Sequence, residues 1–378
     1  PLPNSHPLRR TPLPAFRIAR PPLALANASV SRRHEALNVD LAGGIVSVGE
    51  YYAIINLGGQ PFHVQVDTGS GLTAVPSARC SSCKKGVHRY DIKKSASSGL
   101  MACSDKRCSS SCPGGGGENV SACAFQLSYA DGSWGSGEMA HEELGFEGGS
   151  NADDDLVEVF FGTITSDSSD FEPVSVDGIM GLYNKEDSCS PSCVPTVFQS
   201  FVDDRHLPDV FTICMSQAGG KMVWGAHDTD LVKSGFKYSD IDSSSMFYTV
   251  SIDKEQIKFG DKTFSSPSLS SGIVDTGTTL VVLPTPVFNE IMKELKANYC
   301  DVPATCEKDS WAVDGGCASL SDADIARLPV FQIDLKGGVK LELTADEYML
   351  RYTQNEVQIR CLGFSPMDSS VILGNFLS

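Results

Sequence analysis

The most constraining feature of this chain is a short motif that occurs twice. Residues 66–70 read Val-Asp-Thr-Gly-Ser, and residues 274–278 read Val-Asp-Thr-Gly-Thr. Each copy lies between two apolar, β-prone runs and has an apolar partner that contains glycine further along the chain. These partners are Gly-Ile-Met-Gly-Leu at residues 178–182 and Val-Ile-Leu-Gly at residues 371–374. A unit repeated in this way predicts two halves of similar structure.

Each motif presents one carboxyl group, that of Asp67 or that of Asp275. Two carboxyl groups about one water molecule apart do not both ionise readily, so such a pair shares a proton and offers one acid and one base. This chemistry can activate a water molecule for peptide hydrolysis without a metal. An Asx turn at a strand end would explain one copy of the motif, but it explains two copies poorly. We therefore predict that Asp67 and Asp275 are the catalytic pair.

The other motif positions have predicted supporting roles. The glycines permit a tight turn, which brings the carboxyl groups together. The threonine after each aspartate can lock the two loops through hydroxyl-to-backbone hydrogen bonds. The serine or threonine after each glycine can orient the outer carboxylate oxygens. These residues are Thr68, Gly69, Ser70, Thr276, Gly277 and Thr278.

The body of the chain has the texture of an all-β protein. Short runs of β-branched and aromatic residues alternate with Gly, Ser and Asp, which is typical of many short strands. Helical periodicity is limited to residues 196–203 and 286–298. The predicted strands cover residues 52–57, 62–66, 157–161, 210–214, 221–224, 247–252 and 339–343.

Charge is distributed unevenly over the 378 residues, whose formal net charge is -17. Residues 1–34 contain six arginines and no Lys, Asp or Glu, so a basic leader precedes an acidic body. An acidic body repels nucleic acid and anionic membrane, so we expect no nucleic-acid partner. Because no run of 18 apolar residues occurs, we expect no membrane segment in this chain, and an anchor further downstream stays open.

Residues 1–46 are rich in Pro and Arg and lack clean periodicity. They are predicted to be a prosegment or leader, with a disordered tail or a transit peptide as the alternatives. As a prosegment, the leader would pair its arginines with the acidic body at neutral pH. We expect acid to promote its removal, because carboxylates lose their charge as they are protonated.

Thirteen cysteines and two Asn-X-Ser sequons, at Asn27 and Asn119, favour an oxidising compartment. The predicted location is the secretory pathway, which includes the exterior, a vacuole or lysosome, and the ER lumen. The pair Cys80-X-X-Cys83 could be a redox or zinc motif, but it lies in a six-cysteine cluster that disulfides explain better. His-Glu-X-X-His and Gly-X-Ser-X-Gly motifs do not occur, so we predict no metal site and no cofactor.

With these motifs the chain resembles the pepsin-like aspartic proteases from about Tyr51 onward, and within them the nepenthesin and plasmepsin V branch. The resemblance implies a bilobal all-β fold with the active cleft between the lobes, and an aspartic endopeptidase that acts on a peptide or protein as a monomer. It implies an N-terminal lobe over residues 47–230, with a flap and a Cys-rich insertion at 80–123, and a C-terminal lobe over residues 231–378.

The flap of this family is matched by residues 129–133, Tyr-Ala-Asp-Gly-Ser. The resemblance implies that Tyr129, with Asp131, Gly132 and Ser133, contacts substrate. Asp131 has two interpretations: it binds a basic substrate residue upstream of the cleaved bond, or it forms the turn before Gly132. Ala74 replaces the tryptophan that supports the flap tyrosine in pepsins, so Tyr129 is expected to be held differently.

Cysteine arithmetic alongside the resemblance implies the bridges Cys189–Cys193, Cys300–Cys306 and Cys317–Cys361, and leaves Cys214 over. Cys214 is expected either to pair with a cysteine beyond Ser378 or to be a buried thiol. Three further bridges are expected, in a connectivity that stays open, among Cys80, Cys83, Cys103, Cys108, Cys112 and Cys123.

The family continues after the second downstream partner with strands that complete the C-terminal lobe. A lobe without them would have open strand edges, so we expect the C-terminal end to be truncated and this lobe to be incomplete. The alternative function is a catalytically inactive binding or inhibitor protein on the same fold. Such proteins usually lose an aspartate of the pair or the flap tyrosine, whereas Asp67, Asp275 and Tyr129 are all present.

Overall fold

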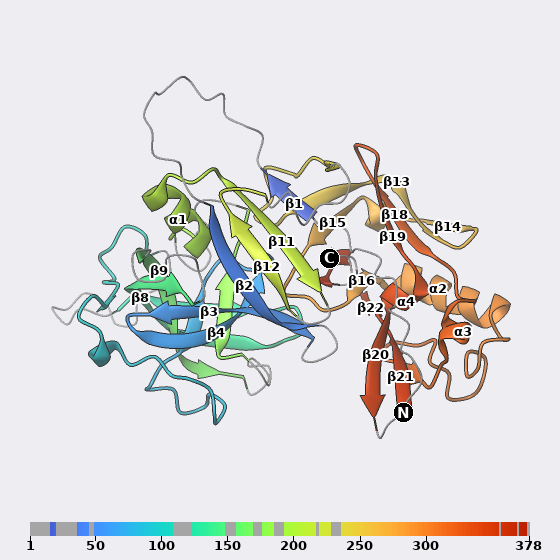
Figure 1. Cartoon of the computed structure of the whole chain (residues 1–378), viewed down its shortest axis with the longest axis horizontal. Helices are drawn as coiled ribbons and strands as arrows, with labels where there is room; N and C mark the ends of the chain where they lie inside the picture. The colour runs from blue at the N-terminus through green and yellow to red at the C-terminus, as the bar shows by residue number, and fades with distance from the viewer. Residues whose placement is uncertain are drawn as a thin grey trace, which may run out of the picture.

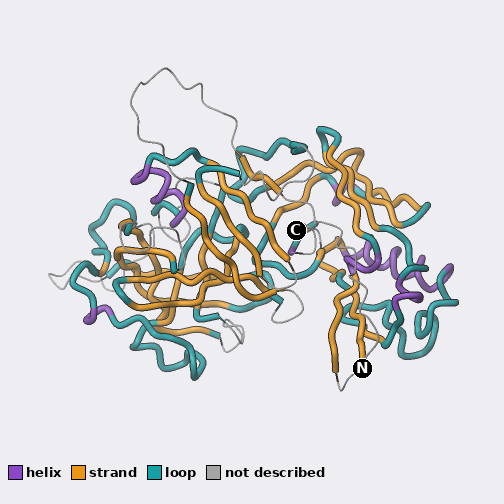
Figure 2. Tube along the Cα trace, viewed as in Figure 1, coloured by secondary structure: helices purple, strands orange, loops and turns teal. Residues whose placement is uncertain are grey.

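A computed structural model shows a chain built mainly from strands, arranged in two lobes (Figures 1 and 2). The predicted bilobal pepsin-like all-β fold is therefore confirmed. The structure describes residues 16–19, 36–44, 49–108, 122–147, 156–168, 176–184, 193–216, 219–227, 236–354, 357–368 and 370–375.

The N-terminal lobe is organised around one sheet, which has twelve strands in the described residues. Its strands are β1 (Phe16–Ala19), β2 (Leu37–Gly44), β3 (Glu50–Leu57), β4 (Gln60–Asp67), β5 (Ala74–Pro76), β6 (Gly99–Leu100), β7 (Ala124–Ser128), β8 (Trp134–Phe146), β9 (Val157–Asp167), β10 (Gly178–Gly181), β11 (Val210–Ser216) and β12 (Gly219–Trp224). Their order is β1-β11-β12-β2-β3-β4-β10-β5-β9-β8-β6, with β7 paired to β8. An additional β3–β8 pairing folds this sheet back on itself.

The core of this lobe follows the alternation of its strands. On β3 the buried side chains are Tyr51, Ala53, Ile55 and Leu57, so one face of the strand is entirely apolar. Helix α1 (Val197–Arg205) begins at the cap residue Thr196, whose hydroxyl accepts a hydrogen bond from the main chain of the first turn. The helix packs against this core.

The C-terminal lobe combines a second sheet, a small third sheet and three helices. The second sheet contains β13 (Thr249–Phe259), β14 (Lys262–Ser265), β15 (Ser271–Val274), β16 (Val281–Pro284), β18 (Phe331–Leu335), β19 (Val339–Leu343), β22 (Phe364–Met367) and β23 (Ile372–Leu373). The third contains β17 (Cys317–Ala318), β20 (Met349–Gln354) and β21 (Val357–Leu362). The C-terminal lobe also has a short 3-10 turn, η3 (Pro267–Leu269), and its helices are α2 (Thr285–Asn298), α3 (Asp322–Ile325) and α4 (Ala345–Tyr348). A second 3-10 turn, η1 (Ile92–Lys94), belongs to the N-terminal lobe.

Several strands lie outside the sequence prediction, and β8 and β2 are two of them. β8 is the longest strand of the structure, yet it holds three glycines and three glutamates and lacks clean alternation. Its Glu142 is fully buried and accepts a hydrogen bond of 2.6 Å from Tyr90 Oη, so a charged residue occupies an inward position. β2 belongs to the predicted leader, but it pairs with β3 and β12 and buries Val39 and Leu41. The last part of the predicted leader is thus built into the sheet.

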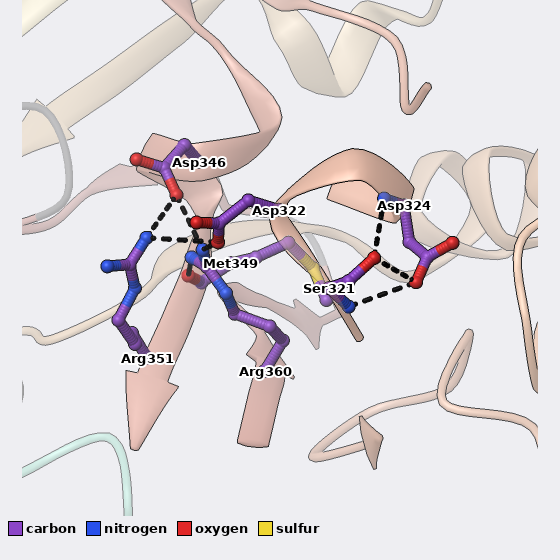
Figure 3. Close-up of polar contacts among 7 residues, drawn as sticks. All are labelled: Ser321, Asp322, Asp324, Asp346, Met349, Arg351 and Arg360. Carbon is purple, nitrogen blue, oxygen red and sulfur yellow. Dashed lines mark hydrogen bonds and ion pairs between the residues drawn. The ribbon is translucent and has the colours of Figure 1, made fainter. Parts of the chain in front are cut away.

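A buried arginine ties the third sheet to the short helices (Figure 3). The Arg360 side chain on β21 is only 1% exposed, and its Nη2 lies 2.8 Å from both Asp322 Oδ1 and Asp346 Oδ1. Its Nη1 donates to Met349 O at 3.4 Å. Arg351, which is 34% exposed, reaches the same two aspartates at 3.5 and 3.0 Å. The two arginines share one pair of carboxylates but differ in burial.

This difference predicts unequal effects of mutation. Arg360→Ala should lower the free energy of unfolding by about 3 kcal/mol, because it removes the hydrogen bonds of a buried cation to two carboxylates and a carbonyl and leaves the space of a large buried side chain empty. Arg351→Ala should lower it by less than about 1 kcal/mol, because exposed ion pairs contribute little. Urea unfolding of both variants measures the two effects. Equal losses would show that burial of Arg360 does not matter.

Candidate active site

The two repeated motifs meet at the junction of the lobes. Thr68 N donates to Thr276 Oγ1 at 3.1 Å, and Thr276 N donates to Thr68 Oγ1 at 3.0 Å. Each hydroxyl also donates to a carbonyl of the other lobe, Thr68 to Val274 O at 2.9 Å and Thr276 to Val66 O at 2.7 Å. Both threonines are buried. Each lobe therefore holds the loop of the other through main-chain and hydroxyl groups, in a lock that we call the threonine lock.

The downstream partners of the motifs lie beside the same loops. β10 runs parallel to β4 with Gly181 opposite Asp67, and Leu182 N donates to Asp67 O at 2.8 Å. β23 runs parallel to β15 in the same way, and Asp275 N donates to Leu373 O at 3.0 Å. The second element of the repeat thus fixes the main chain of each aspartate.

The two carboxyl groups face each other across the lock. A Cβ atom added to Gly69 would lie 2.6 Å from Asp275 Oδ1, and one added to Gly277 would collide with Asp67 Oδ1. Only glycine leaves room for the opposite carboxyl group at these positions. Gly69 N and Gly277 N donate to the Oδ1 atoms of Asp67 and Asp275, at 2.7 and 2.8 Å. Thr278 Oγ1 donates to the second oxygen of Asp275 at 2.7 Å.

The two aspartates differ in their surroundings. Asp67 is 4% exposed, whereas Asp275 is partly exposed. Burial raises the pKa of Asp67 well above its usual value, and the negative charge of Asp275 raises it further. The hydrogen bond from the Gly69 N–H opposes these effects. Burial and the neighbouring charge thus both favour the protonated form of Asp67.

The flap tyrosine reaches this pair from the hairpin of β7 and β8. Burial raises the pKa of Tyr129 well above its usual value, and the charge of Asp67 adds to the shift. Its ring packs against an apolar cluster that includes Leu72, Ala74 and Ile179. This packing is how the ring is held at a place where Ala74 replaces the supporting tryptophan of pepsins.

The rest of the flap forms a tight turn, and the flap hairpin itself lines a pocket of about 290 Å³. Asp131 Oδ1 accepts hydrogen bonds from Ser133 N at 2.8 Å and Ser133 Oγ at 2.7 Å, and Gly132 has a φ of +87°. These contacts correspond to the turn-forming interpretation of Asp131. Tyr129, Gly132 and Ser133 line the pocket together with the exposed ring of Trp134.

Disulfides lie near the base of the flap and in the C-terminal lobe. The described bridges are Cys80–Cys83, Cys108–Cys123, Cys300–Cys306 and Cys317–Cys361. Cys103 and Cys193 are also disulfide-bonded, and Cys214 on β11 is not. Cys80, Cys83 and Cys123 pack in the same apolar cluster as Phe125 and Leu127 of the flap strand β7, so the insertion supports the base of the flap. Asn27, Cys112, Asn119 and Cys189 lie outside the described residues.

One group of potential metal ligands occurs in the described part of the chain, formed by Cys80, Cys83 and Asp167. Its two sulfur atoms are joined to each other, so they are not available as thiolates. Across the described ranges, the helices are too short or too polar to cross a bilayer.

Three residues that the sequence did not single out lie at the pair or at the adjoining start of β3. Gln65 Nε2 donates to Gly277 O at 3.0 Å across the lobes. Tyr183 lies two residues after β10, and the charges of both aspartates contribute to its raised pKa. Glu50 begins β3 beside Gly49, whose carbonyl accepts a hydrogen bond from Thr279 Oγ1 at 2.8 Å. The only sequence signal for any of them is the position of Tyr183 directly after the first downstream partner of the repeat.

Comparison with known proteins agrees with this geometry. The chain belongs to the eukaryotic aspartyl protease family, whose model matches residues 50–378. It is 27% identical to penicillopepsin-1 of Penicillium rubens over 66% of this chain and 57% of that protein. It is 25% identical to aspartic proteinase 36 of Arabidopsis thaliana over 88% of this chain and 70% of that protein. Pepsin A of Gallus gallus is 27% identical over 86% of this chain and 76% of that protein.

The raised pKa of Glu50 predicts that the stability of the protein depends on pH. Burial raises its pKa from 4.5 to about 7, and its Oε2 has no hydrogen-bond partner in the described structure. The folded state thus binds the proton more tightly than the unfolded state does. The contribution of Glu50 to the free energy of unfolding is therefore fully present below about pH 4.5 and is lost as the pH rises to about 7. The shift corresponds to a loss of at most about 3 kcal/mol. Glu50→Gln should flatten this decline in unfolding free energies measured from about pH 4 to 8.

The matched control is Glu290→Gln on α2, a glutamate that is 52% exposed. It should keep the decline of the wild-type protein. An unchanged slope in Glu50→Gln would contradict the assignment of the effect to Glu50.

Proposed function

We propose that this protein is an aspartic endopeptidase that cleaves peptide bonds with a water molecule activated by Asp67 and Asp275. The observation that supports this most strongly is the placement of two carboxyl groups face to face by the threonine lock. The names of the relatives, among them pepsin and penicillopepsin, point to the same reaction class.

The environments of the aspartates suggest their roles. Asp67, which retains its proton, donates it to the carbonyl oxygen of the substrate, while Asp275 takes a proton from the attacking water. The water oxygen bonds to the carbonyl carbon and gives a non-covalent tetrahedral intermediate. Asp275 then protonates the leaving nitrogen as the C–N bond breaks, and Asp67 regains its proton from a hydroxyl of the intermediate. Tyr129 closes over the bound peptide and restricts the access of water.

Finer assignments follow from the resemblance and the cysteines. We place the protein in the nepenthesin and plasmepsin V-like branch, in an oxidising compartment of the secretory pathway, and as a monomer. Residues 47–230 and 231–378 are the proposed lobes, and Asn27 and Asn119 are the proposed glycosylation sites. The inactive binding or inhibitor protein remains the competing function. No observation on Asp67, Asp275 or Tyr129 favours it.

Loss of either aspartate should abolish turnover. Asp67→Asn and Asp275→Asn should each lower kcat on a peptide library by about 10²–10⁴-fold or more, because each removes one partner in proton transfer. Asp261→Asn, an exposed aspartate in the turn between β13 and β14, should leave kcat within about twofold.

A statine-type transition-state mimic separates the two functions. It should inhibit the wild-type protein and bind both aspartate variants more weakly. Wild-type turnover in either variant would refute the catalytic pair. Peptide binding without cleavage or inhibition would favour the binding-protein alternative.

The leader is proposed to be a prosegment that acid releases. Its strand β1 pairs antiparallel with β11 and thereby adds to the edge of the N-terminal sheet. At about pH 4 the acidic body loses negative charge while the arginines keep theirs, so the attraction weakens. The charges involved are Arg9, Arg10, Arg17, Arg20, Arg32 and Arg33.

Incubation at about pH 4 should therefore shorten the wild-type chain from its N-terminus, as followed by mass spectrometry, and should leave Asp275→Asn intact. Replacing the six arginines with glutamine should allow shortening at neutral pH. A leader that stays intact in acid, with activity unchanged by deletion of residues 1–34, which spares β2, would show that it is no prosegment.

A further inference from the structure

A glutamine of the N-terminal lobe reaches across the junction of the lobes. Gln65 lies on β4, two residues before Asp67, and its Nε2 donates to Gly277 O at 3.0 Å. A main-chain carbonyl only accepts hydrogen bonds, so the amide nitrogen is the atom that faces it. The contact joins residues 212 positions apart and adds a side-chain connection between the lobes to those of the threonine lock.

The main chain that Gln65 holds lies against both carboxyl groups. Gly277 N donates to Asp275 Oδ1 at 2.8 Å, and a Cβ atom added to Gly277 would collide with Asp67 Oδ1. The next residue, Thr278, donates its hydroxyl to Asp275 Oδ2 at 2.7 Å. The Asp275 carboxylate is thus oriented by donors on either side of the Gly277 carbonyl. Gln65 fixes that carbonyl.

The C-terminal lobe cannot return this contact. The residue two positions before Asp275 is Ile273, whose side chain has no hydrogen-bond donor. The loop of Asp275 is also the more open of the two, since Asp275 is partly exposed and Asp67 is 4% exposed. Packing therefore restrains the Asp275 loop less, and the amide of Gln65 supplies a contact to it from the strand that carries Asp67.

We infer that Gln65 is a positioning residue, which holds the Gly277 carbonyl so that the Asp275 carboxylate keeps its place opposite Asp67. This inference rests on the proposed endopeptidase function. Two carboxyl groups can share one water molecule only if their oxygen atoms stay at a fixed separation, and a misplacement of about 1 Å can lower a rate about 10²-fold. The neutral amide of Gln65 does not titrate, so its role is distinct from acid–base catalysis.

Replacing the amide with an apolar side chain of similar length tests this role. Gln65→Met should lower kcat about tenfold on a peptide library and leave KM within about twofold, because the anchored carboxylate matters most in the transition state. Gln60→Met is the matched control. Gln60 lies at the opposite end of β4 from Asp67, and its Nε2 donates to another main-chain carbonyl, Asp91 O, at 3.2 Å. This control should leave kcat within about twofold.

A carboxyl group in place of the amide adds a dependence on pH. It can donate a hydrogen bond only when it is protonated. Gln65→Glu should therefore lower kcat about tenfold near pH 6 and should recover towards the wild-type rate below about pH 4. The loss in Gln65→Met should stay the same across this range. A rise in KM with unchanged kcat would overturn the inference, because Gln65 would then act on peptide binding.

Amide hydrogen exchange makes the result independent of turnover. Exchange at residues 277–278, followed by NMR, should be about fivefold faster in Gln65→Met and unchanged in Gln60→Met. Exchange in Gln65→Met that equals that of the wild type would overturn the inference. If the wild type cleaves no peptide, the proposed function fails, and the exchange rates still decide whether Gln65 holds this part of the main chain.

Discussion

The reciprocal hydrogen bonds of Thr68 and Thr276 are the interaction on which the rest of the structure depends. They join residues 208 positions apart, and they engage main-chain groups of both lobes in a buried place. Removing either hydroxyl would leave its buried partner groups unsatisfied, at a cost of about 1–3 kcal/mol for each group. The lobes can therefore carry very different elements, such as the Cys-rich insertion and the β20–β21 hairpin, and still present their carboxyl groups to one point.

The two motifs have nearly the same sequence but different surroundings. Both aspartates follow a valine and precede Thr-Gly, yet Asp67 is 4% exposed and Asp275 is partly exposed. The flap tyrosine lies on the Asp67 side, since the charge of Asp67 contributes to the raised pKa of Tyr129. Burial can thus distinguish two carboxyl groups whose motifs differ only in the final Ser or Thr.

The repeat allowed Asp67, Asp275 and the hydroxyl bonds of the threonines to be predicted, because each depends on a local motif and on the symmetry of two halves. The strand β8 escaped prediction since its buried Glu142 accepts hydrogen bonds from hydroxyl groups that are distant in the sequence, which hydrophobic alternation cannot reveal. Glu50 and Tyr183 escaped for a related reason. The raised pKa of Glu50 depends on its burial in the folded chain, and the ring contact of Tyr183 depends on Phe247, which is far away in the sequence.

Protonation affects both the aspartate pair and the stability of the frame that holds it. Asp67 and Glu50 both have raised pKa values because of burial, so acid favours the protonated pair and also the folded state. Tyr183 also has a raised pKa, because of burial and the charges of the two aspartates. A change in pH would therefore alter both the charge of the aspartate pair and the stability of the frame that holds it.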